Sequence, residues 1–302
     1  MKILITGITG FLGSAVKRTL SAGHEITGLA RSQAADIPCD LAKEVPRIPA
    51  CDMVLHCAGM AHRVPRTPEE EAQFFSLNVT GTKNLLGGIE QSGSLPQTFV
   101  FISSVAVYGL EEGIDITEEA ALLGKSAYAR SKIEAEQYIQ EWCKVHNVHC
   151  VILRLPLITG WNAPGNLGAM QKAIKKGYYF RLGEGNSRRS MVSAVDLARF
   201  IPSVAGKDGV YNLTSGIHYS YAELEAQYAR HYGKKIKAIP HGLARFAARI
   251  GDFIPGFPLN TYRYMKLAQT LTFSDAKARR ELNWNAHGLT ELNSKTDAEH
   301  EK

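Results

Sequence analysis

Residues 2–13 of the chain are KILITGITGFLG, an apolar run followed at once by three glycines with the spacing GxxGxxG. The apolar run is typical of a buried strand, and a helical pattern extends from Gly13 to Ala22. Glycine lets backbone approach a pyrophosphate closely, and the first amides of the following helix attract the same anion. Gly7, Gly10 and Gly13 therefore predict a dinucleotide-binding turn. A tight turn without a ligand is the alternative, but the position between a strand and a helix favours binding.

Short apolar runs alternate with helical patterns downstream of this turn. Strands are predicted at 24–29, 53–57, 98–102 and 149–155, and helices at 68–91 and 126–146. Near-continuous apolar strands that alternate with helices predict an α/β fold, a Rossmann-type doubly wound parallel sheet with helices on both faces. Such sheets bind ligands at the carboxyl ends of their strands.

A change of composition after residue 160, where Gly, Pro and Asn cluster, predicts two parts. Residues 1–160 are expected to form the dinucleotide-binding domain, and 161–302 mainly a smaller C-terminal α/β lobe that binds the substrate. A strand near 210–214 is expected to return to the main sheet. Within the lobe, one helix is predicted to start at Ser220 with a capping-box pattern, and another to cover 241–250.

Composition excludes several classes of protein. The 302 residues carry a net charge of +6 and the pI is about 9.0, but the basic residues are dispersed and do not indicate a nucleic-acid partner. The five cysteines have no CxxC spacing, so neither a disulfide framework nor a metal site is expected, and a cytoplasmic location fits. No stretch approaches the ~20 apolar residues of a membrane span, and no signal peptide is recognisable, so no membrane partner is expected.

The residues after the second predicted strand bear on the choice of cofactor. NAD-binding sheets of this kind usually place an acid there, against the ribose hydroxyls. This chain has Arg31 and Ser32 instead, and an arginine suits the 2′-phosphate of NADP, so NADP is favoured over NAD. An exposed loop cation is the alternative for Arg31. Asp40 and Leu41 follow the next apolar stretch, where Asp40 would cap the adenine amino group or serve as a turn residue.

A YxxxK pair, Tyr128 and Lys132, places a phenol and an ammonium on one face of a predicted helix. The pKa of free tyrosine is about 10, and a nearby cation favours the phenolate. Tyr128 could then exchange a proton with a substrate hydroxyl while a hydride moves to or from a nicotinamide, and Lys132 would hold the nicotinamide ribose. Ser104 ends a predicted strand and would hydrogen-bond the same substrate oxygen. A chance surface pair is the alternative, but the upstream glycine motif and Ser104 favour catalysis.

These residues and their surroundings resemble the extended short-chain dehydrogenase/reductases, the nucleotide-sugar epimerase/dehydratase family. The resemblance spans nearly the whole chain and is specific for the family, much less so for one activity. It is carried by TGITGFLG at 6–13, HCAG at 56–59, NVTGTKNLL at 78–86, FISSVAVYG at 101–109, YARSK at 128–132, RLPLITG at 154–160, RRSMVSAVDLA at 188–198 and ARRELNW at 278–284. The segment CAGMAHR and the charged helix after it are similar to those of bacterial UDP-N-acetylhexosamine 4-epimerases and 4-keto reductases.

The resemblance implies roles for the matched positions. The cofactor would meet Gly7, Thr9, Gly10, Phe11, Leu12 and Gly13 at the pyrophosphate, Cys57, Ala58 and Gly59 beside the ribose, and Pro156, Leu157 and Ile158 beside the nicotinamide. The catalytic positions are matched by Ser104, Tyr128 and Lys132. The sugar nucleotide would meet Ser104, Val105, Asn166 and Arg189. An arginine fork suits a diphosphate, and an ordinary surface charge is the alternative for Arg189.

Three reactions compete within that family: 4-epimerisation, reduction of a 4-keto sugar, and 4,6-dehydration. The dehydratases carry an Asp-Glu pair just after the catalytic Ser/Thr, where this chain has Val105 and Ala106, so dehydration is disfavoured. Epimerases keep NAD bound, whereas reductases exchange NADPH. The resemblance thus implies a 4-epimerase or a 4-keto reductase acting on a nucleotide-diphosphate sugar, with a UDP-linked sugar favoured.

Two further expectations follow from the resemblance. A non-catalytic, regulatory protein with this fold is the alternative of a different class, but such members commonly lack the tyrosine or the lysine. A homodimer is expected through the helices at 69–91 and 126–146. Phe74, Phe75 and Tyr138 would lie on that face, or else in the core.

Overall fold

The computed structural model describes residues 1–61, 63–160, 163–254 and 260–286. Its centre is a sheet of seven parallel strands in the order β12-β7-β5-β4-β1-β2-β3. The strands are β1 (Lys2–Thr6), β2 (Glu25–Ala30), β3 (Ile37–Pro38), β4 (Met53–His56), β5 (Thr98–Ser104), β7 (His149–Leu155) and β12 (Gly209–Asn212). The predicted Rossmann-type α/β fold is confirmed, and the strand order reverses between β1 and β4, where such sheets bind their ligands.

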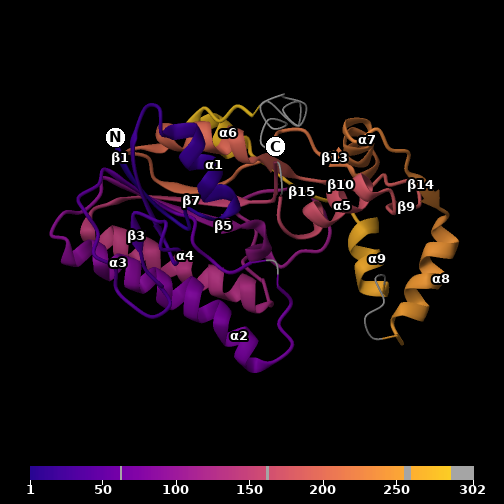
Figure 1. Ribbon diagram of the computed structural model, residues 1–302, viewed down its shortest axis with the longest axis horizontal. Coiled ribbons are helices and arrows are strands. Elements are labelled where there is room, and N and C mark those ends of the chain that lie inside the picture. Colours follow the sequence, from indigo (N-terminus) through magenta and orange to yellow (C-terminus); the bar gives the residue numbers. More distant parts are fainter. Residues whose placement is uncertain (62, 161–162, 255–259, 287–302) are drawn as a thin grey trace.

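Helices cover both faces of this sheet, as Figure 1 shows. One face packs against α1 (Phe11–Leu20), α6 (Ala194–Phe200) and α10 (Ala276–Leu282). The other packs against α3 (Gly81–Gln91) and α4 (Ala127–His146). Every residue of β4 is buried, because both of its faces lie under helices, and this explains the apolar runs without alternation in the sequence.

Two predicted helices have different bounds in the structure. α1 begins at Phe11 and not at Gly13, so the helix starts directly at the glycine turn. The helix expected at 68–91 is divided into α2 (Pro68–Phe75), a π-helical turn η1 (Ser76–Thr80) and α3. A π turn is rare inside a helix and frequently marks a functional site.

Close packing at the glycine turn explains two of its glycines. A Cβ on Gly13 would lie 2.3 Å from the carbonyl oxygen of Gly7, far inside normal contact distance. Gly7 itself has φ +67°, in the left-handed region, and its Cβ would lie 3.0 Å from the backbone of Ala58. The turn can therefore bring α1 close to the end of β4 only with glycine at these two positions.

The smaller lobe lies beyond one end of the main sheet, at the right of Figure 1. It holds a four-stranded sheet of order β13-β10-β15-β6 and two pairs, β11-β8 and β14-β9. The elements not yet given are η2 (Val105–Tyr108), β6 (Gly113–Ile116), β8 (Leu157–Thr159), α5 (Gly165–Lys176), β9 (Phe180–Leu182), β10 (Arg188–Arg189), β11 (Met191–Ser193), η3 (Ile201–Val204), β13 (Tyr219–Ser220), α7 (Tyr221–His231), β14 (Lys237–Ile239), α8 (His241–Gly251), α9 (Thr261–Ala268) and β15 (Leu271–Phe273). The capping box at Ser220 and the helix expected at 241–250 are both present, as the starts of α7 and α8.

Candidate active site

The three residues predicted for catalysis come from two neighbouring elements at the carboxyl ends of the strands. Ser104 is the last residue of β5, and Tyr128 and Lys132 lie on the first two turns of α4. α4 starts where it does because the Ser126 hydroxyl accepts a hydrogen bond from the Ala129 amide (3.1 Å). Ser104 lies close enough to the Tyr128 phenol to lower its pKa, so the alcohol and the phenol converge.

The Tyr128 phenol lies in a largely apolar setting. Its ring meets Phe74 edge-on, with 6.3 Å between ring centroids. Burial raises the pKa of Tyr128 above its usual range, and the hydrogen bond from Ser104 acts in the opposite direction. The sequence led us to expect that Lys132 lowers the pKa of Tyr128. The pKa is raised instead, because the desolvation of the phenol outweighs its favourable contacts. The Tyr128 phenol is therefore protonated at neutral pH.

The Lys132 ammonium contacts strand β5 of the central sheet. Its Nζ donates to the carbonyl oxygen of Ile102 (2.8 Å) and lies 4.4 Å from the centroid of the Phe101 ring. Burial lowers the pKa of Lys132 to about 8, against the opposing influence of Cys57 and Glu136. A buried ammonium with room on one side suits a hydroxyl-bearing partner, since it can still donate further hydrogen bonds.

The end of β4 connects the lysine to the glycine turn. A Cβ on Gly59 would lie 3.3 Å from the Nζ of Lys132, so a side chain at this exposed position would crowd the ammonium. The Ala58 amide donates to the hydroxyl of Thr6 (3.0 Å), which fixes the segment against the end of β1. Burial raises the pKa of the Cys57 thiol to about 12, so it is not a thiolate nucleophile at neutral pH.

A buried histidine underlies this segment. The His56 ring is hydrogen-bonded through Nδ1 to Thr6 Oγ1 (2.7 Å) and through Nε2 to Thr82 Oγ1 (2.9 Å). Burial, with a contribution from the Lys132 charge, lowers the pKa of His56 to about 3. The histidine is therefore a neutral strut between β1, β4 and α3, and not a proton carrier.

We predict that the His56 imidazole stays neutral between about pH 8 and pH 5 in the folded chain, whereas it titrates near 6.5 when unfolded. A folded pKa below the unfolded one means that the stabilisation is complete above about 6.5 and is lost as the pH falls toward about 3. Histidine NMR spectra across this range test the first point, and unfolding in urea at several pH values tests the second. A His56 resonance that titrates near its unfolded value would contradict both.

Asn78 belongs to the site, and the sequence analysis did not single it out. It lies on the π turn η1, is buried, and accepts a hydrogen bond from the Met60 amide (2.7 Å). Its Nδ2 donates to Ser131 Oγ (2.9 Å) on α4. Asn78 thus fixes the segment after β4 against the helix that carries Tyr128 and Lys132. The motif NVTGTKNLL contains it and could have indicated it.

The glycine turn fits a dinucleotide. Thr9 and Gly10 are exposed, and the first turn of α1, with Phe11 and Leu12, follows directly, so its amides face the turn. The Phe11 ring extends toward the smaller lobe, where a Cβ on Gly160 would lie 3.0 Å from it. Pro156, Leu157 and Ile158 are half-buried at the junction of β7 and β8, on the way to Gly160.

The residues expected around the adenosine end of the cofactor lie in different settings. Arg31 is exposed just after β2. Asp36, which the sequence analysis did not consider, accepts a hydrogen bond from the Gly28 amide (2.7 Å) and so holds the loop after β2. Asp40 accepts from the Ala42 amide (3.3 Å) and lies 3.6 Å from Lys43, as a turn residue does. Leu41 is buried in the core under α3.

The expected substrate residues lie on three different elements. Val105 is half-buried on η2, next to Ser104. Asn166 is exposed on the first turn of α5, and Arg189 is half-buried on β10 in the smaller lobe. The structure thus brings Ser104, Tyr128 and Lys132 together in the main domain, whereas Asn166 and Arg189 lie in the smaller lobe and their contact with a substrate stays a prediction.

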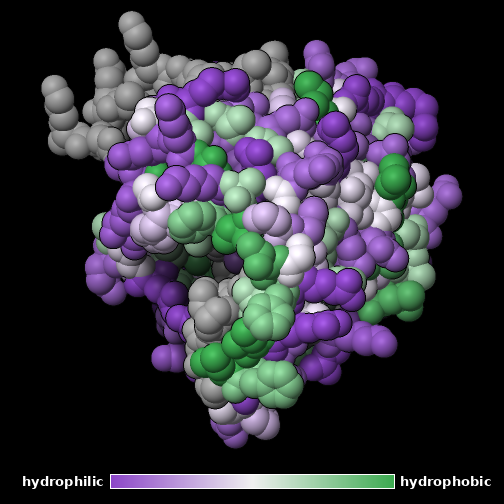
Figure 2. All heavy atoms as spheres, turned by 90° about the vertical axis from the view of Figure 1, so that its right-hand side faces the viewer, coloured by the Kyte–Doolittle hydropathy of each residue, from purple (hydrophilic) through white to green (hydrophobic). Residues whose placement is uncertain are grey.

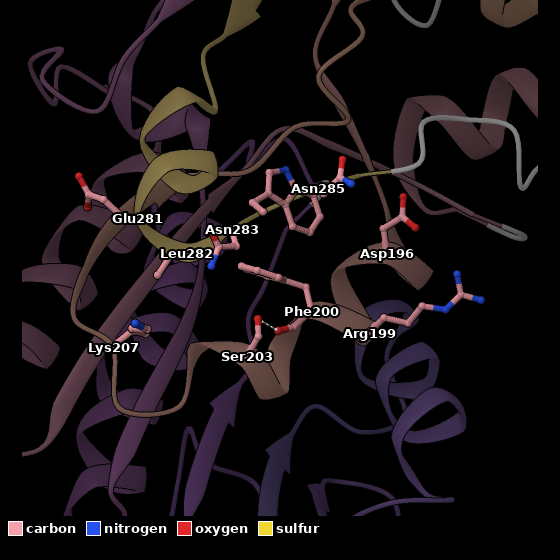
Figure 3. A pocket seen from close by; sticks show the side chains of 10 residues that line it. Asp196, Arg199, Phe200, Ser203, Lys207, Glu281, Leu282, Asn283 and Asn285 are labelled. Atoms are coloured by element: carbon pink, nitrogen blue, oxygen red, sulfur yellow. Dashed lines mark hydrogen bonds between the residues drawn. The ribbon is translucent and has the colours of Figure 1, made fainter.

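A surface cavity of about 370 Å³ lies elsewhere, on the face of the sheet covered by α6 and α10 (Figure 3). It is lined by Asp196, Arg199, Phe200, Ser203, Lys207, Glu281, Leu282, Asn283, Trp284 and Asn285. None of the residues expected for catalysis, cofactor or substrate lines it. The Ser203 hydroxyl in it already donates to the Phe200 carbonyl oxygen (2.7 Å). We therefore assign the chemistry to the strand ends and not to this cavity.

Other expectations can be compared with the described residues. Within residues 1–61, 63–160, 163–254 and 260–286, no cluster of three or more His, Cys, Asp or Glu side chains could hold a metal ion. In the same part of the chain no helix combines the length and the apolar character needed to cross a bilayer.

The helices expected to pair two copies expose few apolar residues. Phe74 is buried and therefore belongs to the core, and Phe75 is half-buried beneath Arg130, whose guanidinium lies 5.4 Å from the ring centroid. Tyr138 is exposed, with the Lys83 ammonium 4.9 Å from its ring centroid. A homodimer through the helices at 69–91 and 126–146 stays a prediction, with Tyr138 and Val145 as exposed apolar side chains of α4.

Comparison with known proteins gives one matching family and several relatives. The family described as "NAD dependent epimerase/dehydratase family" matches residues 3–214. The N-acetyl-alpha-D-glucosaminyl-diphospho-ditrans,octacis-undecaprenol 4-epimerase of Escherichia coli is 26% identical over 91% of this chain and 88% of its own length. The GDP-6-deoxy-D-mannose reductase of Pseudomonas aeruginosa is 33% identical over 47% of each chain. Among solved structures, UDP-N-acetylglucosamine 4-epimerase from Bacillus cereus superimposes with a TM-score of 0.72 over 95% of this chain and 94% of its own, at 19% identity, a likeness of fold.

Proposed function

The chain belongs to the NAD dependent epimerase/dehydratase family, and on that premise we propose that it transfers a hydride at C4 of a nucleotide-diphosphate sugar, with Tyr128 as acid/base. One observation carries the proposal: Ser104 and the Tyr128 phenol converge at the strand ends, next to a lysine and a glycine turn that suits a dinucleotide. An alcohol and a phenol on one substrate oxygen are what proton exchange at a carbonyl or carbinol needs.

The cofactor in this proposal is held by the chain's own backbone and by Lys132. Gly7, Gly10 and Gly13 with the first amides of α1 receive the pyrophosphate. A bound nicotinamide supplies or accepts the hydride. Lys132 donates to the ribose hydroxyls from its place beside Gly59, and Asn78 keeps that segment against α4.

Reduction of a 4-keto sugar with NADPH is the direction that the site favours. The Tyr128 phenol carries a proton at neutral pH, and the oxygen that becomes negative when hydride adds to a ketone can accept it. An acid after β2 would repel the 2′-phosphate of NADP, but this chain has the exposed Arg31 at that position. The nearby Asp36 carboxylate accepts a hydrogen bond from the Gly28 amide. The relation to the GDP-6-deoxy-D-mannose reductase supports the same direction.

A 4-epimerase is the second candidate. The relative from Escherichia coli that aligns with nine-tenths of this chain is named as a 4-epimerase. In an epimerase, Tyr128 would first accept the hydroxyl proton and then return it, which requires the bound cofactor and Lys132 to lower the pKa of the phenol. In both reactions, Arg189 and Asn166 of the lobe would contact the diphosphate of the nucleotide sugar, and we favour a UDP-linked sugar.

The test measures turnover and cofactor together on the purified chain. We expect NADPH oxidation in step with reduction of a 4-keto nucleotide sugar, with a higher kcat/KM for NADPH than for NADH, because Arg31 can pair with a 2′-phosphate. Cofactor released by denaturing the protein should be absent or NADP. Bound NAD, with interconversion of 4-epimers and no net NADPH consumption, would replace reduction by epimerisation. A chain that binds NAD(P) and turns over neither kind of sugar would overturn both in favour of a regulatory protein.

A further inference from the structure

The smaller lobe exposes an unusual amount of apolar surface on α8 and the residues just after it. Five apolar side chains point outward here and form what we call the α8 strip: Leu243, Phe246, Ile250, Phe253 and Ile254. Phe246 is 65% exposed and Phe253 88% exposed. Figure 2 shows hydrophobic side chains gathered along a strip in the lower half of this face, bordered by hydrophilic ones. A strip of this kind on a soluble domain marks a contact surface.

The helix divides into three faces. Ala244, Ala248 and Gly251 recur at helical spacing and are buried, so they form the face that packs on the lobe. Arg245 and Arg249 are exposed and lie four residues apart, on one side of the α8 strip. The small residues set how closely the helix lies on the lobe, and they leave the large apolar side chains outside the core.

The hairpin of α8 and α9 is held in shape by polar contacts of its own. Asp252 accepts hydrogen bonds from the Thr261 amide (2.9 Å) and from the Thr261 hydroxyl (2.5 Å). The His241 ring is hydrogen-bonded to the Tyr264 hydroxyl (3.1 Å). The apolar exposure is therefore a property of a defined structure, since these bonds fix both ends of the hairpin.

The charge around the strip is mainly positive. Residues 234–254 hold five Lys or Arg and a single acidic residue, Asp252. Lys234, Lys235 and Lys237 are exposed on and before β14, in addition to the two arginines of α8. Asp252 is engaged with Thr261. A partner for this surface must therefore be apolar at its centre and negative around it.

We propose that α8 binds in the plane of an anionic lipid bilayer, with the α8 strip in the headgroup region and the surrounding cations on lipid phosphates. A short helix with Phe, Leu and Ile on one face and arginines beside it is the pattern of interfacial helices. A second copy of the chain would bring the same cations to the strip, which opposes pairing of this face with itself. The absence of a spanning helix among the described residues does not bear on this mode, because the helix lies on the membrane and does not cross it. The expectation of no membrane partner, which rested on the lack of a span, is revised accordingly.

The test is sedimentation of the full chain with vesicles of phosphatidylcholine, or of phosphatidylcholine mixed with phosphatidylglycerol. We expect binding to the anionic vesicles that weakens as salt is raised. Phe246→Asp with Phe253→Asp should lower that binding at least about tenfold, and Arg245→Gln or Arg249→Gln roughly fivefold each. Val145→Asp on α4 is the matched control, an equally exposed apolar residue far from the strip, and should change nothing.

The circular dichroism spectrum and the turnover of a water-soluble nucleotide sugar should be unchanged in all these variants. A loss of vesicle binding can therefore be distinguished from a loss of the proposed enzymatic function. Equal binding to neutral and anionic vesicles, or binding that survives the paired Phe→Asp changes, would overturn the proposal. So would a chain that ignores both vesicles but forms a dimer lost on Phe246→Asp with Phe253→Asp, which would make the strip an interface between copies.

Discussion

Tyr128→Phe is expected to lower kcat by roughly 10²–10⁴-fold and to leave the fold intact. The change removes one oxygen, which lies near Ser104, and keeps the ring in its place against Phe74. In the proposed arrangement Lys132 does not replace the lost proton donor, because its ammonium, beside Gly59, meets the cofactor ribose. The measurement is steady-state turnover of the nucleotide sugar, with cofactor binding followed separately by fluorescence.

Tyr138→Phe is the matched control, since it makes the same chemical change on the same helix at an exposed position. It should retain wild-type turnover. Ser104→Ala is expected to lower turnover by less than Tyr128→Phe does. Its effect is also less specific to catalysis, because the Ser104 hydroxyl accepts a hydrogen bond from the Ala106 amide (3.2 Å) at the start of η2. If the Tyr128 and Tyr138 variants kept equal activity, the phenol at 128 would have no part in the chemistry.

Much of the site could be predicted from sequence because its parts are local. A glycine turn between a strand and a helix, and a Tyr and Lys four residues apart on one helix, are set by backbone geometry over a few residues. The position of Ser104 followed from the end of an apolar run. The parallel sheet followed from the same runs, since only strands covered on both faces show them.

The remainder depends on packing between distant segments. The π turn divides a stretch with one continuous helical pattern, and Asn78 on it is hydrogen-bonded to Ser131 of α4, which is distant in sequence. The raised pKa of Tyr128 depends on burial, which no spacing in the sequence specifies. The outward direction of Phe246 likewise depends on which face of α8 the lobe covers, because a sequence pattern gives the faces of a helix but not its neighbour.

A buried ion pair, Arg154–Glu136, lies next to the elements that carry the catalytic residues. Arg154 on β7 donates to both carboxylate oxygens of Glu136 on α4, with Nη2 2.7 Å from Oε2 and Nε 3.2 Å from Oε1. The Glu136 carboxylate also accepts from the Ser103 hydroxyl, and Arg154 Nη1 donates to the Tyr108 hydroxyl (3.2 Å). Ser103 precedes Ser104, and Glu136 lies one helical turn after Lys132. The pair therefore joins β5, β7 and α4 directly under the catalytic residues.

Glu136→Ala is expected to lower the free energy of unfolding by about 3–5 kcal/mol, because it leaves the Arg154 guanidinium buried without its anion. Both side chains are almost completely shielded from water, with 1% and 6% of the side-chain surface exposed, so solvent cannot replace the lost partner. Equilibrium unfolding in urea measures the loss, and turnover should fall with it if Ser104 and Lys132 shift.

Glu71→Ala separates this effect from the loss of any ion pair. The Arg130–Glu71 pair has a similar distance of 3.0 Å, but about half of each side chain is exposed, so its removal should cost only about 0–1 kcal/mol. Replacing both members of the buried pair, as Glu136→Met with Arg154→Met, should recover part of the loss, since no unpaired charge remains. Equal losses for Glu71→Ala and Glu136→Ala would mean that burial adds nothing to the pair. Loss in the double variant as large as in Glu136→Ala would mean that the hydrogen bonds to Tyr108 and Ser103, and not the uncompensated charge, hold these three elements together.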